Sequence, residues 1–295
     1  MNAIAASFSK PAVSSRKARK ARHSPHQIRH YLYEPPGPKT RIRIRIATVL
    51  SVIVLGAIGG YAIYQFYITN QLAPRYWSFF FKASTWVFLG QGLWSTVKVA
   101  LMAAAVAFGL GLAMMLGRIS GIKVLSAIST ALIEFSRGVP TLLFIYFFFL
   151  VAPQIGLPLP AFWKITLPVA ISAAGVVAEV LRSGVNAVPK GQREAAISLG
   201  MRRSNVFFKI IFPQALRYVI PSLIAELVIV LKDTTFASIV SYADLMQRSK
   251  VLISNYDALV SVYLVTAVIY VLVNYLLNKL AVAFSARRSD VQIML

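Results

Sequence analysis

Long apolar runs alternate with short polar segments along this chain. Six of these runs approach or exceed the ~20 residues that a helix needs to cross a hydrocarbon core ~30 Å thick. They are residues 46–68, 92–116, 128–152 and 160–184, a run from Tyr218 that Lys232 and Asp233 interrupt, and residues 258–277. The pattern therefore predicts an all-α membrane protein with six transmembrane helices.

The polar segments divide the chain into parts of different character. We expect a basic cytoplasmic arm over 1–45, a transmembrane helix over 46–68, an extracytoplasmic loop over 69–91, a transmembrane domain over 92–284 and a cytoplasmic tail over 285–295. Within the transmembrane domain, residues 188–213 are expected to form a long cytoplasmic loop.

Composition and charge agree with a bilayer environment. Hydrophobic residues make up 58% of the 295 residues, and the formal net charge is +22. Basic residues are concentrated before Ile46 and in the segments that share its side of the membrane, as the positive-inside rule requires of cytoplasmic segments. We therefore place both termini in the cytoplasm of a cell whose inner membrane holds the chain. A tail that binds nucleic acid or lipid is the alternative for the arm, and the usual role of a basic flank favours orientation.

Several kinds of enzyme are excluded by what the chain lacks. It has no cysteine, and its only histidines, His23, His26 and His30, all lie in the arm. A metal site there is the alternative to a charged flexible arm, which is the simpler interpretation. A membrane-embedded enzyme needs a nucleophile, an acid–base pair or a metal cluster within its spans. We therefore expect no catalytic residues, no metal site and no nucleic acid as partner.

The 188–213 loop is too long for a plain connection between packed helices, which takes about 2 to 8 residues. It is predicted to form two short helices, one starting at Pro189 and ending at Gly200, the other capped by Ser204 and stopped by Pro213. Its charges and apolar side chains suit docking to another protein. They would equally suit an amphipathic helix pair on the lipid surface, and the pattern alone leaves both open.

The order of motifs in this half of the chain resembles that of one family. Glu194-Ala195-Ala196, followed by Gly200 and Pro213, is similar to the EAA loop of ATP-binding-cassette importer permeases, with Phe212 where the family has leucine. Further segments resemble its polar amino-acid uptake branch, which includes glutamate, glutamine, histidine and arginine permeases: 135–140, 179–184, 188–192, 213–217 and 232–235. The resemblance covers about Gly92 to Ala283, and the added residues 1–70 are similar in layout to glutamate permease subunits.

This resemblance implies a methionine-permease-like five-helix core with an added N-terminal helix. It implies a permease that imports a polar amino acid, glutamate by preference, together with ATPase subunits, a sister or identical permease and an extracytoplasmic substrate-binding protein. ATP and Mg²⁺ would bind to the ATPase and no cofactor to this chain, which contains no Gly-Lys dipeptide. The residues implied to contact the ATPase are Gly191, Gln192, Glu194, Ala195, Ala196, Leu199, Gly200, Phe208 and Pro213.

Charged side chains at membrane depth are costly and usually face the bundle interior or an aqueous path. We expect Glu226, Lys232, Asp233, Thr234 and Thr235 to line the route of a zwitterionic substrate, with mutual pairing of the charges as the alternative. Family members commonly carry asparagine in place of Ala225, so Glu226 can supply that polar function from the next position.

Four residues receive a structural interpretation. Glu179 is expected to pair with Arg182, which lies three residues further along the helix. Arg137 is expected to anchor the third span by snorkelling, and Pro140 to bend it.

An ion channel or a carrier driven by an ion gradient is the alternative from another functional class. Such carriers usually contain duplicated halves, and the EAA pattern occurs once in this chain.

Overall fold

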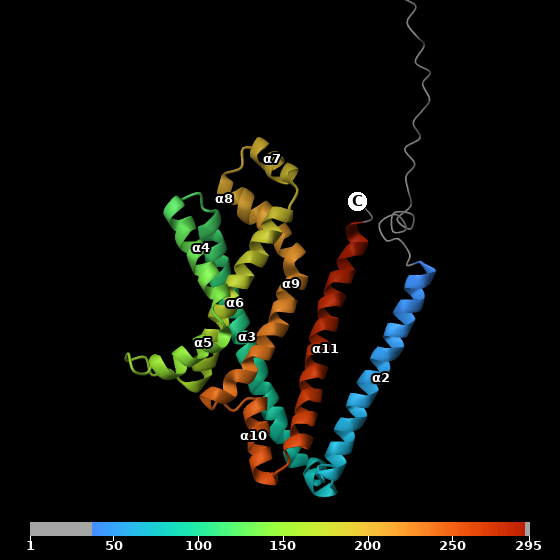
Figure 1. The fold of residues 1–295 in the computed structure, drawn as a ribbon. Helices are drawn as coiled ribbons and strands as arrows, with labels where there is room; N and C mark the ends of the chain where they lie inside the picture. Colours follow the sequence, from blue (N-terminus) through green and yellow to red (C-terminus); the bar gives the residue numbers. More distant parts are fainter. Residues whose placement is uncertain (1–36, 293–295) are drawn as a thin grey trace, which may run out of the picture. The chain divides into compact units, whose positions relative to one another are not determined.

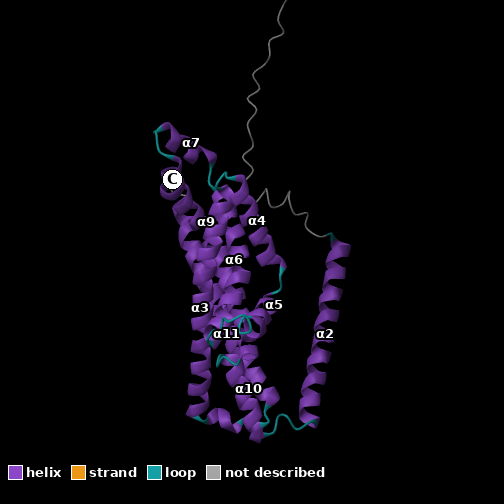
Figure 2. Ribbon diagram, turned by 90° about the vertical axis from the view of Figure 1, so that its left-hand side faces the viewer, coloured by secondary structure: helices purple, strands orange, loops and turns teal. Residues whose placement is uncertain are grey.

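The computed structural model describes residues 37–292, and all regular structure in that range is helical (Figure 2). The chain divides into two units, Met1–Gln65 and Phe66–Leu295. His23, His26, His30 and most of the predicted arm lie outside the described residues. In chain order the elements are α2 (Pro38–Ile68), η1 (Pro74–Tyr76), η2 (Ser78–Phe81), α3 (Ala83–Ile119), α4 (Lys123–Gly138), α5 (Thr141–Tyr146), η3 (Phe147–Val151), α6 (Ala161–Ala187), α7 (Lys190–Ser198), α8 (Arg203–Asn205), η4 (Val206–Ile211), α9 (Phe212–Asp233), η5 (Thr234–Val240), α10 (Leu245–Tyr256) and α11 (Leu259–Gln292).

Helix α2 makes up the described part of the first unit. It begins at Pro38 rather than at Ile46, so the basic residues just before the apolar run are helical. Proline suits the first helical position because its missing amide hydrogen would have no partner there. None of the residues of α2 is buried. A helix that is apolar on every side and exposed in this way suits a lipid environment.

Three helices, α3, α6 and α9, form the centre of the second unit (Figure 1). Their backbones approach closely where a glycine faces a neighbour. A Cβ atom added to Gly111 of α3 would lie 2.8 Å from the Ala174 carbonyl oxygen of α6. One added to Gly184 of α6 would lie 2.5 Å from Val219 of α9. Small residues at such crossings let helices gain van der Waals contact that the bilayer itself does not drive.

The third predicted span is broken in two. α4 and α5 are bent by 96° at a short break around Val139 and Pro140. Pro140 is the N-cap of α5, and Val139 before it has an extended conformation, with φ −91° and ψ 125°. A proline disfavours the α conformation of the preceding residue, which explains why the helix ends here. The bend expected at Pro140 is therefore a complete interruption of the helix.

The segment predicted as a loop over 69–91 is largely helical. It contains η1, η2 and the start of α3 at Ala83. Its aromatic side chains pack against the far end of the unit: the rings of Phe79 and Tyr256 stack with centroids 4.2 Å apart, and the Ser261 hydroxyl donates to the Tyr76 carbonyl oxygen at 2.6 Å. These contacts tie the segment to α10 and α11.

Six continuous spans are not what the structure shows. Among the described residues, α2, α3, α6 and α11 are long and apolar enough to cross a membrane, and the α4–α5 pair with η3 adds a fifth span when counted as one. The run predicted from Tyr218 corresponds to α9, which carries Glu226, Lys232 and Asp233 and is not among these helices. The prediction of an all-helical membrane protein is confirmed, with four or five spans by this measure.

Replacing Gly111 with alanine should destabilise the unit, because the new methyl group meets the α6 backbone. Overpacking of this kind typically costs about 1 to 3 kcal/mol of unfolding free energy. Gly109 is the matched control, since it lies on the same helix and an added Cβ meets no atom within 4 Å. We expect Gly111→Ala to lower the melting temperature of the purified protein in detergent, and Gly109→Ala to leave it unchanged or raise it. Equal effects of the two substitutions would contradict this account of the α3–α6 crossing.

Candidate functional site

The 188–213 loop projects at one end of the second unit, where α7 is seen beyond the ends of α6 and α9 (Figure 1). α7 has Pro189 as its N-cap, and Gly200 after it adopts the left-handed conformation, with φ 77°. The second predicted helix differs from expectation. Ser204 makes no capping hydrogen bond, and Pro213 stands in the first turn of α9, so the helix continues through it. A proline is tolerated there because the amide groups of a first turn need no helical partner.

Most residues of this loop are exposed, and a few apolar ones are buried. Ala196 is 5% exposed and packs with Val188, Val206 and Ile211 in a small core that holds α7 against η4. Leu199, by contrast, is 83% exposed. The other predicted contact residues, with the single exception of Ala196, are also exposed: Gly191, Gln192, Glu194, Ala195, Gly200, Phe208 and Pro213. The loop therefore has its own apolar core and still presents apolar side chains outward.

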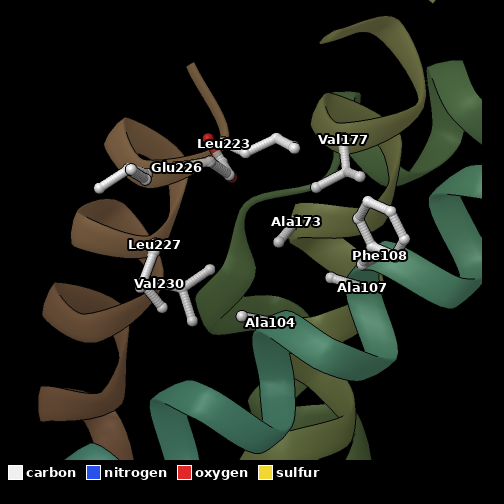
Figure 3. A pocket seen from close by; sticks show the side chains of 10 residues that line it. Ala104, Ala107, Phe108, Ala173, Val177, Leu223, Glu226, Leu227 and Val230 are labelled. Carbon is white, nitrogen blue, oxygen red and sulfur yellow. The ribbon is translucent and has the colours of Figure 1, made fainter. Parts of the chain in front are cut away.

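A cavity of about 180 Å³ lies between α3, α6 and α9. Figure 3 shows its lining side chains converging from these three helices. Nine of its ten lining residues are apolar and the tenth is Glu226: Ala104, Ala107, Phe108, Ala173, Val177, Leu223, Ile224, Glu226, Leu227 and Val230. We refer to this space as the central cavity.

Glu226 is the one ionisable residue in the lining of the central cavity, and it is only 8% exposed. Within the described part of the chain, no side chain or backbone group donates a hydrogen bond to its carboxyl group, and no cation forms an ion pair with it. A buried carboxylate without a partner is costly, and a site of this kind commonly meets its partner in a ligand. The central cavity can therefore accept a group that carries a positive charge or donates hydrogen bonds.

The other predicted pathway residues lie at the end of α9, outside the central cavity lining. Lys232 is exposed, whereas Asp233 is half-buried. The Thr234 hydroxyl donates to the Leu231 carbonyl oxygen at 2.7 Å, and the Thr235 hydroxyl donates to that of Lys232 at 2.8 Å. Both threonines thus bond to their own helix, at the point where α9 gives way to the tighter turn of η5.

Asp233 bonds to a different helix. Its Oδ2 accepts a hydrogen bond from the Thr141 hydroxyl at 3.1 Å, and the Thr141 oxygen lies 2.8 Å from the Ser172 hydroxyl oxygen. Thr141 begins α5 and Ser172 lies in α6, so the contact joins three helices. The sequence pattern alone gave no indication of these partners, because 92 and 31 residues separate them from Thr141 along the chain.

Glu179 is the centre of a cluster of arginines. The expected pair is present, with the Arg182 Nη2 atom 2.8 Å from the Glu179 Oε2 atom. Arg118 of α3 also binds Glu179, and Arg137 of α4 lies 3.8 Å from it. Arg137 is thus placed at the end of α4 beside α6, and the acid links α3, α4 and α6. Arg118 was not predicted, since its partner lies 61 residues away.

Residues 105–290 match the family described as "Binding-protein-dependent transport system inner membrane component". Among curated proteins, the chain is similar to the glutamate transport system permease protein GluD of Corynebacterium glutamicum. The two are 33% identical over 217 residues, which is 72% of this chain and 79% of that protein. It is also 31% identical to the probable glutamine ABC transporter permease protein GlnP of Bacillus subtilis, over 70% of this chain and 93% of that protein.

The chain is also similar to solved structures of ABC transporters. A structure described as "an amino acid ABC transporter with histidines" aligns with a TM-score of 0.64 and 31% identity, covering 68% of this chain and 94% of the other. An inward-facing MetNI methionine ABC transporter aligns with a TM-score of 0.55 and 16% identity, covering 69% of this chain and 99% of the other. The second likeness concerns the fold alone.

Proposed function

Because this chain belongs to the family of inner-membrane components of binding-protein-dependent transport systems, we propose that it is the permease subunit of an ATP-driven importer of polar amino acids. This family consists of the inner-membrane components of such systems and not of their ATPases. The chain is therefore a multi-pass membrane protein. The amino-acid substrate is supported by relatives named for glutamate, glutamine, arginine and cystine transport. Glutamate is the first substrate to test, because the GluD protein covers 72% of this chain.

The proposed topology has six spans with both termini in the cytoplasm. α9 supplies the sixth, in addition to the four single helices and the broken α4–α5 pair. Five of the six form the permease core, and α2 is the added N-terminal helix. The orientation rests on the basic residues, which favour the cytoplasmic side. It places the 188–213 loop in the cytoplasm.

The observation that carries the proposed function is the folded, outward-facing 188–213 loop. Leu199, Ile197 and Phe208 are 83%, 51% and 54% exposed, although the loop has a small apolar core of its own. Apolar side chains in such positions suit a protein interface, with Glu194 as a charged contact at its edge. We propose that an ATPase subunit, which binds ATP and Mg²⁺, docks here. A substrate-binding protein and a second permease, identical or sister, complete the importer.

Glu226 is proposed as the substrate contact in the central cavity. Amino acids carry an ammonium group, which can both donate hydrogen bonds to this carboxylate and neutralise it. The apolar lining around it would strengthen the attraction, because the local dielectric constant is low. The remaining predicted residues lie about two helical turns beyond Glu226, or ~10 Å. They are Lys232 and Asp233 at the end of α9 and Thr234 and Thr235 at the start of η5. They are proposed to shape the route beyond the central cavity.

The docking proposal predicts that Glu194→Lys and Leu199→Ser each lose the ATPase subunit. Complexes would be purified in mild detergent from the native host through a tag on this chain, and the retained proteins identified by mass spectrometry. Leu157→Ser is the matched control, since Leu157 is also exposed, at 55%, and lies outside the loop. We expect at least a tenfold loss of ATPase in the two loop variants and none in the control, a difference of ~1.4 kcal/mol or more in binding. Full retention by both loop variants would rule out docking at this face.

The central cavity proposal predicts that Glu226→Gln lowers uptake at least tenfold without loss of the ATPase. Glutamine keeps the size of the side chain and removes its charge. Glu134→Gln is the control, because Glu134 is 60% exposed and its 3.7 Å pair with Arg137 is of the exposed kind that contributes little stability. The measurement is uptake of radiolabelled amino acids into cells that depend on this permease. Normal uptake by Glu226→Gln would exclude the carboxylate as a substrate contact.

A further inference from the structure

The break between α4 and α5 is held on both sides by hydrogen bonds to α6. Before the break, the Ser136 hydroxyl donates to the Ile171 carbonyl oxygen at 2.8 Å and accepts from the Gly175 amide at 3.0 Å. These two backbone groups are four residues apart, the spacing at which they pair in a regular helix. Ser136 thus lies directly against the α6 backbone. Gly175 allows this, since an added Cβ would lie 2.5 Å from the Ser136 hydroxyl oxygen.

After the break, the attachment passes through Thr141. A hydroxyl has one hydrogen to donate, and the Thr141 hydroxyl gives it to Asp233. The Ser172 hydroxyl, 2.8 Å away, is then the donor to the Thr141 oxygen. The result is a directed chain of two hydrogen bonds from Ser172 through Thr141 to Asp233, which ends on a carboxylate. Hydrogen bonds that end on a charged group are the stronger kind.

These two hydrogen bonds connect two walls of the central cavity. Ser172 adjoins Ala173, a lining residue on α6, and Asp233 lies three residues beyond Val230, a lining residue on α9. Asp233 is also seven residues beyond Glu226, so the two acids lie on the same face of α9. Thr141 therefore bridges the helix that carries Glu226 to the helix opposite. Among the described residues, no lysine or arginine forms an ion pair with Asp233, and Thr141 is its side-chain hydrogen-bond donor.

We infer that Asp233 is a positioning residue: through Thr141 it holds the first turn of α5 between α6 and α9, and so fixes the spacing of the central cavity walls. It acts on the substrate through this spacing and not by direct contact. The expected effect of Asp233 on transport rests on the proposed function. The mechanical part, that Asp233 anchors α5, stands on the hydrogen bonds alone.

The two roles for Asp233 predict different results for the same substitutions. An anchor needs an acceptor atom, so Asp233→Asn should preserve it and Asp233→Ala should destroy it. A substrate contact needs the charge, so Asp233→Asn should already be inactive. Thr141→Val removes the bridging hydroxyl with little change of shape, and Thr141→Ser restores it. Thr130→Val is the matched control, because the Thr130 hydroxyl bonds within α4, to the Ser126 carbonyl oxygen at 2.8 Å.

The first measurement is hydrogen–deuterium exchange of the α5 amides in the permease complex, in lipid nanodiscs. We expect the α5 amides to exchange about tenfold faster in Thr141→Val and Asp233→Ala, as for the loss of one hydrogen bond. In Thr141→Ser, Asp233→Asn and Thr130→Val, the exchange rate should equal that of the wild type. Unchanged exchange in both Thr141→Val and Asp233→Ala would overturn the inference. If Asp233→Ala does not assemble, Thr141→Val decides by itself.

The second measurement is uptake of a mixture of radiolabelled L-amino acids by the same variants in proteoliposomes. Positioning predicts a lower maximal rate with little change in KM for Thr141→Val and Asp233→Ala, and a double variant no slower than the slower single one. Loss of uptake in Asp233→Asn, with full uptake in Thr141→Val, would overturn the inference in favour of a direct substrate contact. Absence of uptake by the wild-type complex would refute the proposed function alone, because the exchange result does not depend on a substrate.

Discussion

Helix α6 can serve as the centre of the bundle because it carries small residues at the places where its neighbours cross. Ala174 meets Gly111 of α3, Gly175 meets Ser136 of α4, and Gly184 meets Val219 of α9. A bilayer gives apolar helices little reason to associate, so close backbone contact and a few hydrogen bonds must supply the stability. The same crossings set the distances between helices. The size of the central cavity is therefore a consequence of how tightly α6 is packed.

Two groups of polar contacts on α6 hold different neighbouring helices. Near its end, Glu179 gathers Arg118, Arg137 and Arg182, which joins α3 and α4 to α6. Near its middle, Ser172 takes part in the chain that ends on Asp233 of α9. Between these two groups lies Glu226, which has no such partner among the described residues. Glu179 and Asp233 hold helices together through their partners, whereas Glu226 faces the central cavity.

Much of this arrangement could be predicted from the sequence, because apolar length and local pairing are properties of short segments. The pair of Glu179 and Arg182 depends on a spacing of three residues, and the bend at Pro140 on one residue. The bridge from Thr141 to Asp233 could not be predicted, since it depends on how three distant segments fold together. The stop expected at Pro213 was wrong because a proline in a first helical turn is as compatible with a helix start as with a helix end. The six-span count included the run from Tyr218, whose charged residues keep α9 out of the helices that are apolar enough to span by themselves.

In the proposed function, an ATPase docked on the 188–213 loop drives the movements of the permease. The most direct test is reconstitution of the complex, purified from its native host, into proteoliposomes that are supplied with the substrate-binding protein. Uptake of radiolabelled glutamate and other amino acids would be measured with ATP inside, with ADP inside, and with a proton or sodium gradient alone. We expect uptake to require both ATP and the binding protein. Uptake driven by an ion gradient without ATP would contradict the proposed function and identify a carrier of another class.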